Sequence, residues 1–362
     1  MPLNTKRLQL LSVETHVPAR FLSRDDTLAQ LPTLAGGHEG SVRFRGMVER
    51  SRIDRRHIET SLEELLHLTP GARSRIFEQR SRELAEDLGS RALRAAGIQG
   101  RDLGVVITVS CTGYMLPSVD AYVLPRLGVP PEARRVPVTE LGCSAGVGGL
   151  GVATELLDSR AGHALVVSIE LCSSCMQTTD LAASDVIGNI LFADAAAAAV
   201  VGRSPDPRGP EILAAGTSLW PETTDALGMR LSDTGLRLVL SPDLPNLVAQ
   251  HLPATLDGFL AAHDVRRSDV EFWVIHPGGP RVLEAVGATL QLSERALAPS
   301  WAVWSAYGNV SSATVFFILE ALRQMNPVPA GRLGVMMAFG PGLSCELLLL
   351  RSGGWLSDAA FA

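Results

Sequence analysis

Apolar residues along this chain gather in short continuous runs, and longer segments of mixed polarity separate these runs. Four of the runs predict buried strands, at residues 103–110, 163–170, 270–276 and 332–342. Four intervening segments have the length and composition of helices, at residues 117–128, 143–159, 281–292 and 311–325. Strands that are apolar throughout and alternate with helices are typical of sheets covered on both faces. The pattern therefore predicts an α/β fold.

The predicted elements follow the same order in the two halves of the chain. His276 lies 166 residues after Ser110, and Asn309 lies 166 residues after Cys143. This constant spacing predicts one α/β unit used twice, with an N-terminal half at 1–205 and a C-terminal half at 206–362. The stretch GRSPDPRGPE, residues 202–211, is rich in Pro and Gly and marks the boundary. The alternative is a chance alignment of two unrelated α/β halves.

Three residues at the predicted strand ends are candidates for chemistry. Cys143 stands where a strand gives way to a helix, and the unpaired N–H groups of a helix start lower the pKa of a thiol. His276 ends a strand before the turn PGGP, and Asn309 precedes a helix. Each has a structural alternative: a small buried thiol, a core imidazole and a helix cap. Together they supply a nucleophile and two N–H donors for a developing oxyanion.

The composition narrows the class of protein. The chain has 362 residues, is 46% hydrophobic and carries a net charge of −6 without a block of like charges. A general nucleic-acid binder is therefore not expected. No apolar run reaches the roughly 18 residues that a membrane span needs, and the first twenty residues lack the apolar core of a signal peptide. Five cysteines in such a chain argue against a disulfide framework, and we expect a cytoplasmic protein.

Six separate stretches resemble a known family when they are read in order. They are CTGYMLPSVD, ELGCSAG, LFADAAAAAVVG, HPGGP, YGNVSSA and AFGPGLSCE. In these stretches the chain resembles the type III polyketide synthases, the chalcone-synthase-like branch of the thiolase-fold condensing enzymes. The resemblance implies a thiolase-like fold, in which the duplicated α/β unit forms an αβαβα layer arrangement.

The resemblance also implies roles for individual residues. Cys143 would carry the acyl chain, while His276 and Asn309 would hold the thioester carbonyl. The aromatic gatekeeper of the family falls on Phe192, and its second gatekeeper falls on Leu238. CoA contacts would come from Arg43, Arg50 and Gly278, whereas Gly46 stands where the family has a third basic contact. A charged helix face exposed to solvent is the alternative reading of this arginine-rich stretch.

The substrates implied by the resemblance are acyl-CoA and malonyl-CoA. No metal, flavin or nicotinamide and no acyl-carrier protein are expected. Leu116 stands where the family has a residue that crosses into the partner's cavity, so a homodimer is implied.

The residues expected around the cavity bear on the product. Small side chains are expected in its wall at Cys111, Thr112, Cys172, Ser174 and Cys175, and the loop Phe339, Gly340, Pro341 and Gly342 is expected to shape it. The stretch around Leu238 is similar to bacterial alkylpyrone and alkylresorcinol synthases, which predicts a fatty acyl starter. Cys111 is instead similar to the tetrahydroxynaphthalene synthases, which start from malonyl-CoA. Cys172 and Cys175 also form a C-x-x-C, for which a redox pair or half a zinc site is the alternative.

Three other classes share part of this pattern. A ketoacyl synthase III-like enzyme would use the same catalytic residue types, condense once and need a carrier protein. A papain-like hydrolase would share Cys, His and Asn but not the duplicated α/β pattern. A thiolase-fold protein without activity would have had no reason to keep all three residues.

Overall fold

The computed structural model describes residues 7–159, 162–204 and 209–357. Its main sheet has nine strands in the order β11-β12-β13-β8-β1-β7-β6-β4-β5. The strands of the N-terminal half are β1 (Arg7–His16), β4 (Leu103–Val109), β5 (Arg134–Val138), β6 (His163–Leu171) and β7 (Asp194–Ser204). Those of the C-terminal half are β8 (Glu211–Leu219), β11 (Val270–Ile275), β12 (Leu333–Gly340) and β13 (Ser344–Arg351). The two parts of the sheet meet at β1 and β8, where Gln9 pairs with Glu211.

The predicted duplication of the α/β unit is confirmed by the strand order. β4-β6-β7-β1 in the first half corresponds to β11-β12-β13-β8 in the second half. In each series the first pair is parallel, and the next two pairs are antiparallel. The halves differ at the sheet edge, because the second half has helix α11 (Glu294–Tyr307) where the first half has strand β5. The predicted boundary falls partly on residues 205–208, which lie outside the described residues.

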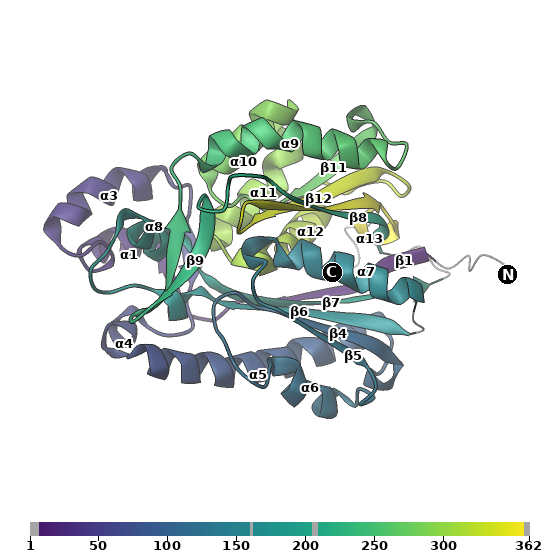
Figure 1. The fold of residues 1–362 in the computed structure, drawn as a ribbon, viewed down its shortest axis with the longest axis horizontal. Coiled ribbons are helices and arrows are strands. Elements are labelled where there is room, and N and C mark those ends of the chain that lie inside the picture. The colour runs from purple at the N-terminus through teal and green to yellow at the C-terminus, as the bar shows by residue number, and fades with distance from the viewer. Residues whose placement is uncertain (1–6, 160–161, 205–208, 358–362) are drawn as a thin grey trace.

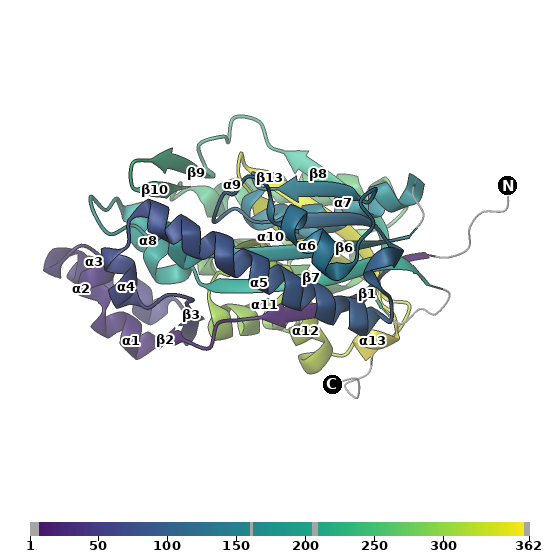
Figure 2. The ribbon, with the colours of Figure 1, turned by 90° about the horizontal axis from the view of Figure 1, so that it is seen from below.

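Five layers of helices and sheet follow from this arrangement (Figure 1). The helices α5 (Pro70–Ala96) and α6 (Val119–Leu127) cover the outer face of the first half-sheet, as Figure 2 also shows. The outer face of the second half-sheet is covered by α9 (Leu244–Ala261) and α10 (Pro280–Leu290). Between the half-sheets lie α7 (Ala145–Ser159) and α12 (Thr314–Met325), which share one apolar core with both. The αβαβα arrangement is therefore confirmed.

The small residues of α7 allow this middle layer to close. A Cβ on Gly146 would lie 2.1 Å from the backbone oxygen of Ser312, in the 3-10 turn just before α12. Any larger side chain at this position would push the two central helices apart. The glycine-rich sequence that follows Cys143 is thus explained by helix packing.

Shorter elements gather at the end of the sheet where β4, β6 and β11 terminate (Figures 1 and 2). They are β2 (Phe21–Ser23), β3 (Arg55–His57), α1 (Arg24–Ala29), α2 (Leu31–Leu34), α3 (His38–Arg50), α4 (Leu62–His67), α8 (Ala183–Leu191) and the hairpin β9 (Leu227–Ser232) to β10 (Gly235–Leu240). The short helix α13 (Gly354–Ser357) ends the described chain. None of the described helices combines the length and the apolar character that crossing a membrane requires.

Candidate active site

Cys143 lies in a turn of 3-10 helix, Gly142–Ser144, that joins β5 to α7. Its thiol lines a pocket at this end of the sheet. Its Sγ atom lies 3.5 Å from Oγ of Ser311, which belongs to the other half of the chain. The duplicated fold thus brings the start of α7 against the turn before α12.

His276 follows β11 directly, and its backbone N–H donates to the oxygen of Met337 on β12 at 3.0 Å. The side chain is 1% exposed, and neither ring nitrogen has a hydrogen-bond partner among the described residues. Burial lowers the pKa of His276 to about 4, so the imidazole is neutral near neutral pH. A buried imidazole without partners can donate to or accept from a ligand.

The side chain of Asn309 is held in one orientation by two hydrogen bonds. Its Oδ1 accepts from the backbone N–H of Ser311 at 2.9 Å, and its Nδ2 donates to the oxygen of Gly278 at 3.2 Å. The second bond connects Asn309 to the turn that follows His276. Because an amide nitrogen carries two hydrogens, one N–H remains for a ligand oxygen.

The backbone of Asn309 is also fixed. Its N–H donates to the oxygen of Leu191, and its own oxygen accepts from the N–H of Ala193 at 2.9 Å. An isolated parallel bridge pairs it with Phe192. The expected gatekeeper Phe192 therefore lies beside Asn309.

The pocket beside Cys143 is lined by residues from both halves of the chain. Its wall is mainly apolar, and β2, α2, α4 and β10 contribute to it. Apolar members of the lining include Leu22, Leu34, Ile58, Leu62, Leu65 and Leu236. An apolar pocket that ends at a thiol can hold a hydrophobic acyl group at a nucleophile.

The buried carboxyl group of Glu170, at the end of β6, accepts hydrogen bonds from several segments near Cys143. It accepts from Thr112 Oγ1 at 3.0 Å, from the backbone N–H of Cys111 at 3.2 Å and from Ser312 Oγ. Burial raises the pKa of Glu170. Cys111 in turn lies 3.3 Å from Ser311 Oγ through its Sγ atom. These contacts hold the loop after β4 and the turn before α12 around Cys143.

Two family models match the chain and together cover most of it. The model of the N-terminal domain of chalcone and stilbene synthases matches residues 8–205, and that of the C-terminal domain matches residues 211–353. The chain belongs to the chalcone and stilbene synthase family.

Individual relatives agree with this assignment. A 1,3,6,8-tetrahydroxynaphthalene synthase from Streptomyces peucetius subsp. caesius is 40% identical over 277 residues, which are 74% of this chain and 72% of that protein. The α-pyrone synthesis polyketide synthase-like Pks18 of Mycobacterium tuberculosis is 29% identical over 350 residues, 92% of this chain and 88% of its own.

A solved structure extends the likeness to three dimensions. The tetrahydroxynaphthalene synthase of Streptomyces coelicolor A3(2), a bacterial type III polyketide synthase, aligns with a TM-score of 0.90 at 30% identity. The alignment covers 95% of this chain and 99% of that one. The protein is a type III polyketide synthase with a thiolase fold, and hence an acyltransferase.

In this synthase, most of the expected cavity residues lie around the pocket. Its lining includes Cys111, Thr112, Cys172, Cys175, Phe192, Leu238 and Pro341. The two cysteines of the C-x-x-C, Cys172 and Cys175, lie at the two ends of a 3-10 turn in the pocket wall. The Sγ atom of Cys175 donates to the oxygen of Thr112 at 3.2 Å. All five cysteines are free thiols.

Four expected cavity residues lie elsewhere. The Ser174 hydroxyl donates to the oxygens of Leu171 and Thr112, and Ser174 and Gly342 line a neighbouring pocket instead. Phe339 is buried in the outer core, with its ring centroid 6.0 Å from that of Trp220. A Cβ on Gly340 would lie 2.2 Å from Ser144 Oγ, so this glycine lets β12 pass close to the Cys143 turn.

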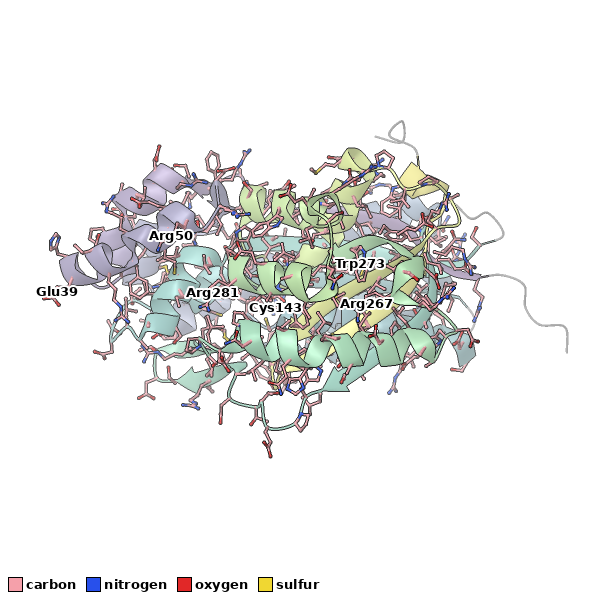
Figure 3. The ribbon with its side chains drawn as sticks, turned by 90° about the horizontal axis from the view of Figure 1, so that it is seen from above. Glu39, Arg50, Cys143, Arg267, Trp273 and Arg281 are labelled. Carbon is pink, nitrogen blue, oxygen red and sulfur yellow. The ribbon has the colours of Figure 1, made fainter. Side chains whose placement is uncertain are left out.

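The residues expected to contact CoA divide into two groups. Arg43 and Arg50 are exposed on α3, whereas the carbonyl of Gly278 is occupied by Asn309. In the view of Figure 3, Arg281 at the start of α10 lies between Arg50 and Cys143. Arg281 is exposed and follows the turn PGGP, but nothing in the sequence alone distinguished it from other surface arginines. Leu116 is 83% exposed in the single chain.

The expected lowering of the thiol pKa is wrong for the free protein. Burial raises the pKa of Cys143 to about 12, which outweighs the hydrogen bond from Ser311. Burial also keeps His276 neutral, so neither Cys143 nor His276 is charged near neutral pH in the free protein. The physical reason is that the same closed layers that position the thiol also remove the water that would solvate its charge.

This state of the thiol predicts a pH dependence for chemical modification. Only the thiolate reacts with iodoacetamide, so the rate at Cys143 in the free protein is expected to rise about tenfold per pH unit from pH 6 to pH 10. The measurement is site-resolved mass spectrometry of peptides, with the fully buried Cys345 as an internal control. A plateau between pH 6 and pH 8 would instead indicate a thiolate–imidazolium pair.

Proposed function

We propose that this type III polyketide synthase loads an acyl-CoA starter onto Cys143 and extends it by repeated decarboxylative condensation with malonyl-CoA. Cyclisation then releases an alkylpyrone or alkylresorcinol-type product. The observation that supports this function is the apolar pocket next to Cys143, to which β2, α2 and α4 contribute leucines. Such a wall suits a hydrocarbon chain.

Loading begins with the neutral pair of Cys143 and His276. As the thiol attacks the thioester carbonyl, the imidazole takes its proton and later returns it to the departing CoA sulfur. The free N–H of Asn309 and the N–H that the imidazole gains from the thiol donate to the carbonyl oxygen as it becomes negative. The acyl group then remains on Cys143 as a thioester.

Extension uses the same two donors. Malonyl-CoA loses CO₂, and the electron pair of the broken C–C bond becomes an enolate whose oxygen accepts from His276 and Asn309. The enolate carbon attacks the acyl thioester, and Cys143 leaves as a thiolate that can accept the lengthened chain. Only CoA thioesters are consumed, so neither a further cofactor nor an acyl-carrier protein is part of the proposal.

A second candidate function has a specific observation in its favour. Cys111, Cys172 and Cys175 all line the pocket, and the 40% identical relative is a tetrahydroxynaphthalene synthase. Malonyl-CoA would then serve as both starter and extender. The apolar wall contributed by α2 and α4 favours the acyl-primed reaction.

One incubation separates the two functions. The purified protein is given labelled malonyl-CoA, alone or with acyl-CoAs from acetyl to palmitoyl and aromatic ones, and the products are identified by mass spectrometry. Products with alkyl tails support the first function, and a pentaketide from malonyl-CoA alone supports the second. Single condensations that require a carrier protein would contradict both.

The remaining expectations form part of the same proposal. Arg43, Arg50 and Arg281 would hold the CoA phosphates at the mouth of the site. A homodimer is supported by the exposed apolar side chains of Tyr114, Leu116 and Leu231, which are 67%, 83% and 78% exposed in the single chain. We also propose two structural halves, 1–205 and 206–362, and a cytoplasmic location, with no nucleic acid or membrane as partner.

Replacement of Leu238 by phenylalanine is expected to shift starter preference toward short chains. The side chains of Leu238 and Phe192 lie next to each other at Gly188: a Cβ placed on this glycine would be 3.5 Å from Leu238 Cδ2 and 4.0 Å from Phe192 Cδ2. A phenyl ring at position 238 would therefore narrow the pocket beside the gatekeeper Phe192. The ratio of kcat/KM for palmitoyl-CoA to that for acetyl-CoA should fall about tenfold or more.

The control is Val239→Phe, since the neighbouring side chain points to the other face of the hairpin. If Leu238→Phe leaves long-chain use unchanged, Leu238 does not border the acyl path.

A further inference from the structure

Arg56, on the short strand β3, is a buried cation in the wall of an apolar pocket. Its side chain is 4% exposed, and it lines the same pocket as Cys143. Its Nη1 donates to the oxygen of Phe192 at 2.8 Å. Its Nε and Nη2 have no hydrogen-bond partner among the described residues. Buried N–H groups of a charged side chain call for an acceptor.

The free nitrogens form one edge of the guanidinium. Nη1 is held by Phe192, and the edge made of Nε–H and Nη2–H keeps two unpaired donors among the described residues. Burial lowers the pKa of Arg56 to about 10, so the group remains charged near neutral pH. This edge matches two neighbouring oxygens that share a negative charge.

The carboxyl group that acts electrostatically on Arg56 is engaged elsewhere. Asp194 accepts from the backbone N–H and hydroxyl of Ser173 and from the backbone N–H of Glu59, at 2.5 to 2.7 Å. Its charge favours the guanidinium without a hydrogen bond to it. The acceptor for Arg56 must therefore come from outside these residues.

A second buried arginine shows what a purely structural role looks like. Arg73 on α5 donates from Nη2 to the oxygen of Leu65 at 2.7 Å and from Nη1 to the oxygen of Met176. Both of its terminal nitrogens are thus used on the backbone, and Arg73 is not part of the lining of the Cys143 pocket. Arg56 differs in that it lines that pocket while two of its nitrogens, Nε and Nη2, remain without a partner among the described residues.

Arg56 also lies against the catalytic amide. A Cβ on Gly308 would be 3.1 Å from Cγ of Arg56, so the stem of the arginine packs on the residue before Asn309. Its terminal nitrogen holds the backbone of Phe192, which pairs with Asn309. The position is close to where an extended chain would leave the catalytic residues.

We propose that Arg56 binds the β-keto oxygens of the growing chain in their enolate form and so holds the poly-β-keto intermediate in the pocket. This inference rests on the proposed iterative condensation. A 1,3-dicarbonyl loses the proton between its carbonyl groups to water, and the negative charge spreads over two oxygens. The free edge of Arg56 accepts this charge with two parallel hydrogen bonds.

The carboxylate of malonyl-CoA is a poorer ligand for the same group. A guanidinium on that carboxylate would stabilise the charged ground state more than the transition state that releases neutral CO₂, and would slow decarboxylation. Binding the enolate of the product chain does not slow a reaction step in this way, because the enolate keeps its charge until the next extension.

The test measures the enolate directly. Acetoacetyl-CoA is added to the Cys143→Ala protein, which cannot be acylated at this position. Calorimetry gives its binding, and ultraviolet absorbance gives the ratio of bound enolate to bound keto form at a fixed pH. When Arg56→Met is added to the Cys143→Ala protein, the charge that pairs with the enolate is removed. The ratio of bound enolate to bound keto form is then expected to fall about tenfold or more. Arg56→Lys, which keeps the charge but loses the fork, should give an intermediate ratio.

The matched control is Arg73→Met in the same background, which should leave the ratio unchanged even if it lowers the melting temperature. The proposal is overturned if Arg56→Met, or Arg56→Lys where the methionine variant does not fold, shows the same ratio as the parent. It is equally overturned if acetoacetyl-CoA binds without any rise in enolate, or does not bind. Failure of the proposed function is a different result, namely no malonyl-dependent product from the protein with Cys143 intact.

Discussion

The Cys143→Ala protein is expected to form no covalent acyl adduct and to lose product formation by at least about a thousandfold. The reason is that the proposed reaction passes through a thioester on this sulfur, and the structure places no other thiol in the same turn before α7. Intact-protein mass spectrometry after incubation with an acyl-CoA measures the adduct, and chromatography of labelled products measures turnover.

The control for this experiment is Cys345→Ala, on β13 in the outer core, where the thiol is fully buried. That variant should retain the adduct and the product. Acylation of the Cys143→Ala protein at another cysteine, with turnover preserved, would contradict the assignment of the nucleophile. Cys111 and Cys175, which share the pocket, are the positions where such an adduct would be sought.

Replacement of Asn309 by alanine is expected to slow malonyl-CoA decarboxylation by about a hundred- to a thousandfold, as loss of one oxyanion donor does elsewhere. Acyl loading on Cys143 should fall less than about tenfold, because the attack by the thiol also draws on His276 as base. The two steps are measured separately, by release of labelled CO₂ and by the mass of the acylated protein.

Asn309→Asp sharpens the same prediction. Aspartate keeps an acceptor for the N–H of Ser311, which lies 2.9 Å from Oδ1, but removes the amide donor. Decarboxylation should therefore be lost in this variant too, while a role limited to holding Ser311 would leave it active. Equal losses of loading and decarboxylation in the alanine variant would contradict the role assigned to Asn309.

The neutral state of the free site has a consequence for both experiments. Burial holds the pKa of Cys143 near 12 and that of His276 near 4, so neither residue titrates between pH 6 and pH 10 in the free protein. A change of product formation within that range would belong to the substrate complex, where the thioester alters the surroundings of both groups.

Much of the architecture was readable from the pattern of residues. The apolar runs predicted the strands on either side of Cys143 and His276, and the spacing of 166 residues predicted that β4 and β11 occupy equivalent places. Because the carboxyl ends of parallel strands share one edge of a sheet, residues at those ends were expected to meet. Cys143 and Ser311, two residues beyond Asn309, are in contact at that edge.

Other features depended on contacts between distant segments. Arg56 and Phe192 are 136 residues apart, and Cys111 and Ser311 are 200 residues apart, so no local signal distinguished these residues. The orientation of Ser174 and Phe339 also escaped prediction, since a position in a turn does not say which way a side chain points.

The sequence by itself determined the strand and helix pattern, the duplication and the residue types at the strand ends, because periodicity and spacing are local properties. Only the tertiary structure decided the protonation state of Cys143, the lack of partners for Nε and Nη2 of Arg56, and the hydrogen bonds around Glu170. The physical reason is that desolvation and hydrogen bonding depend on which atoms surround a group, and in this fold those atoms come from both halves of the chain.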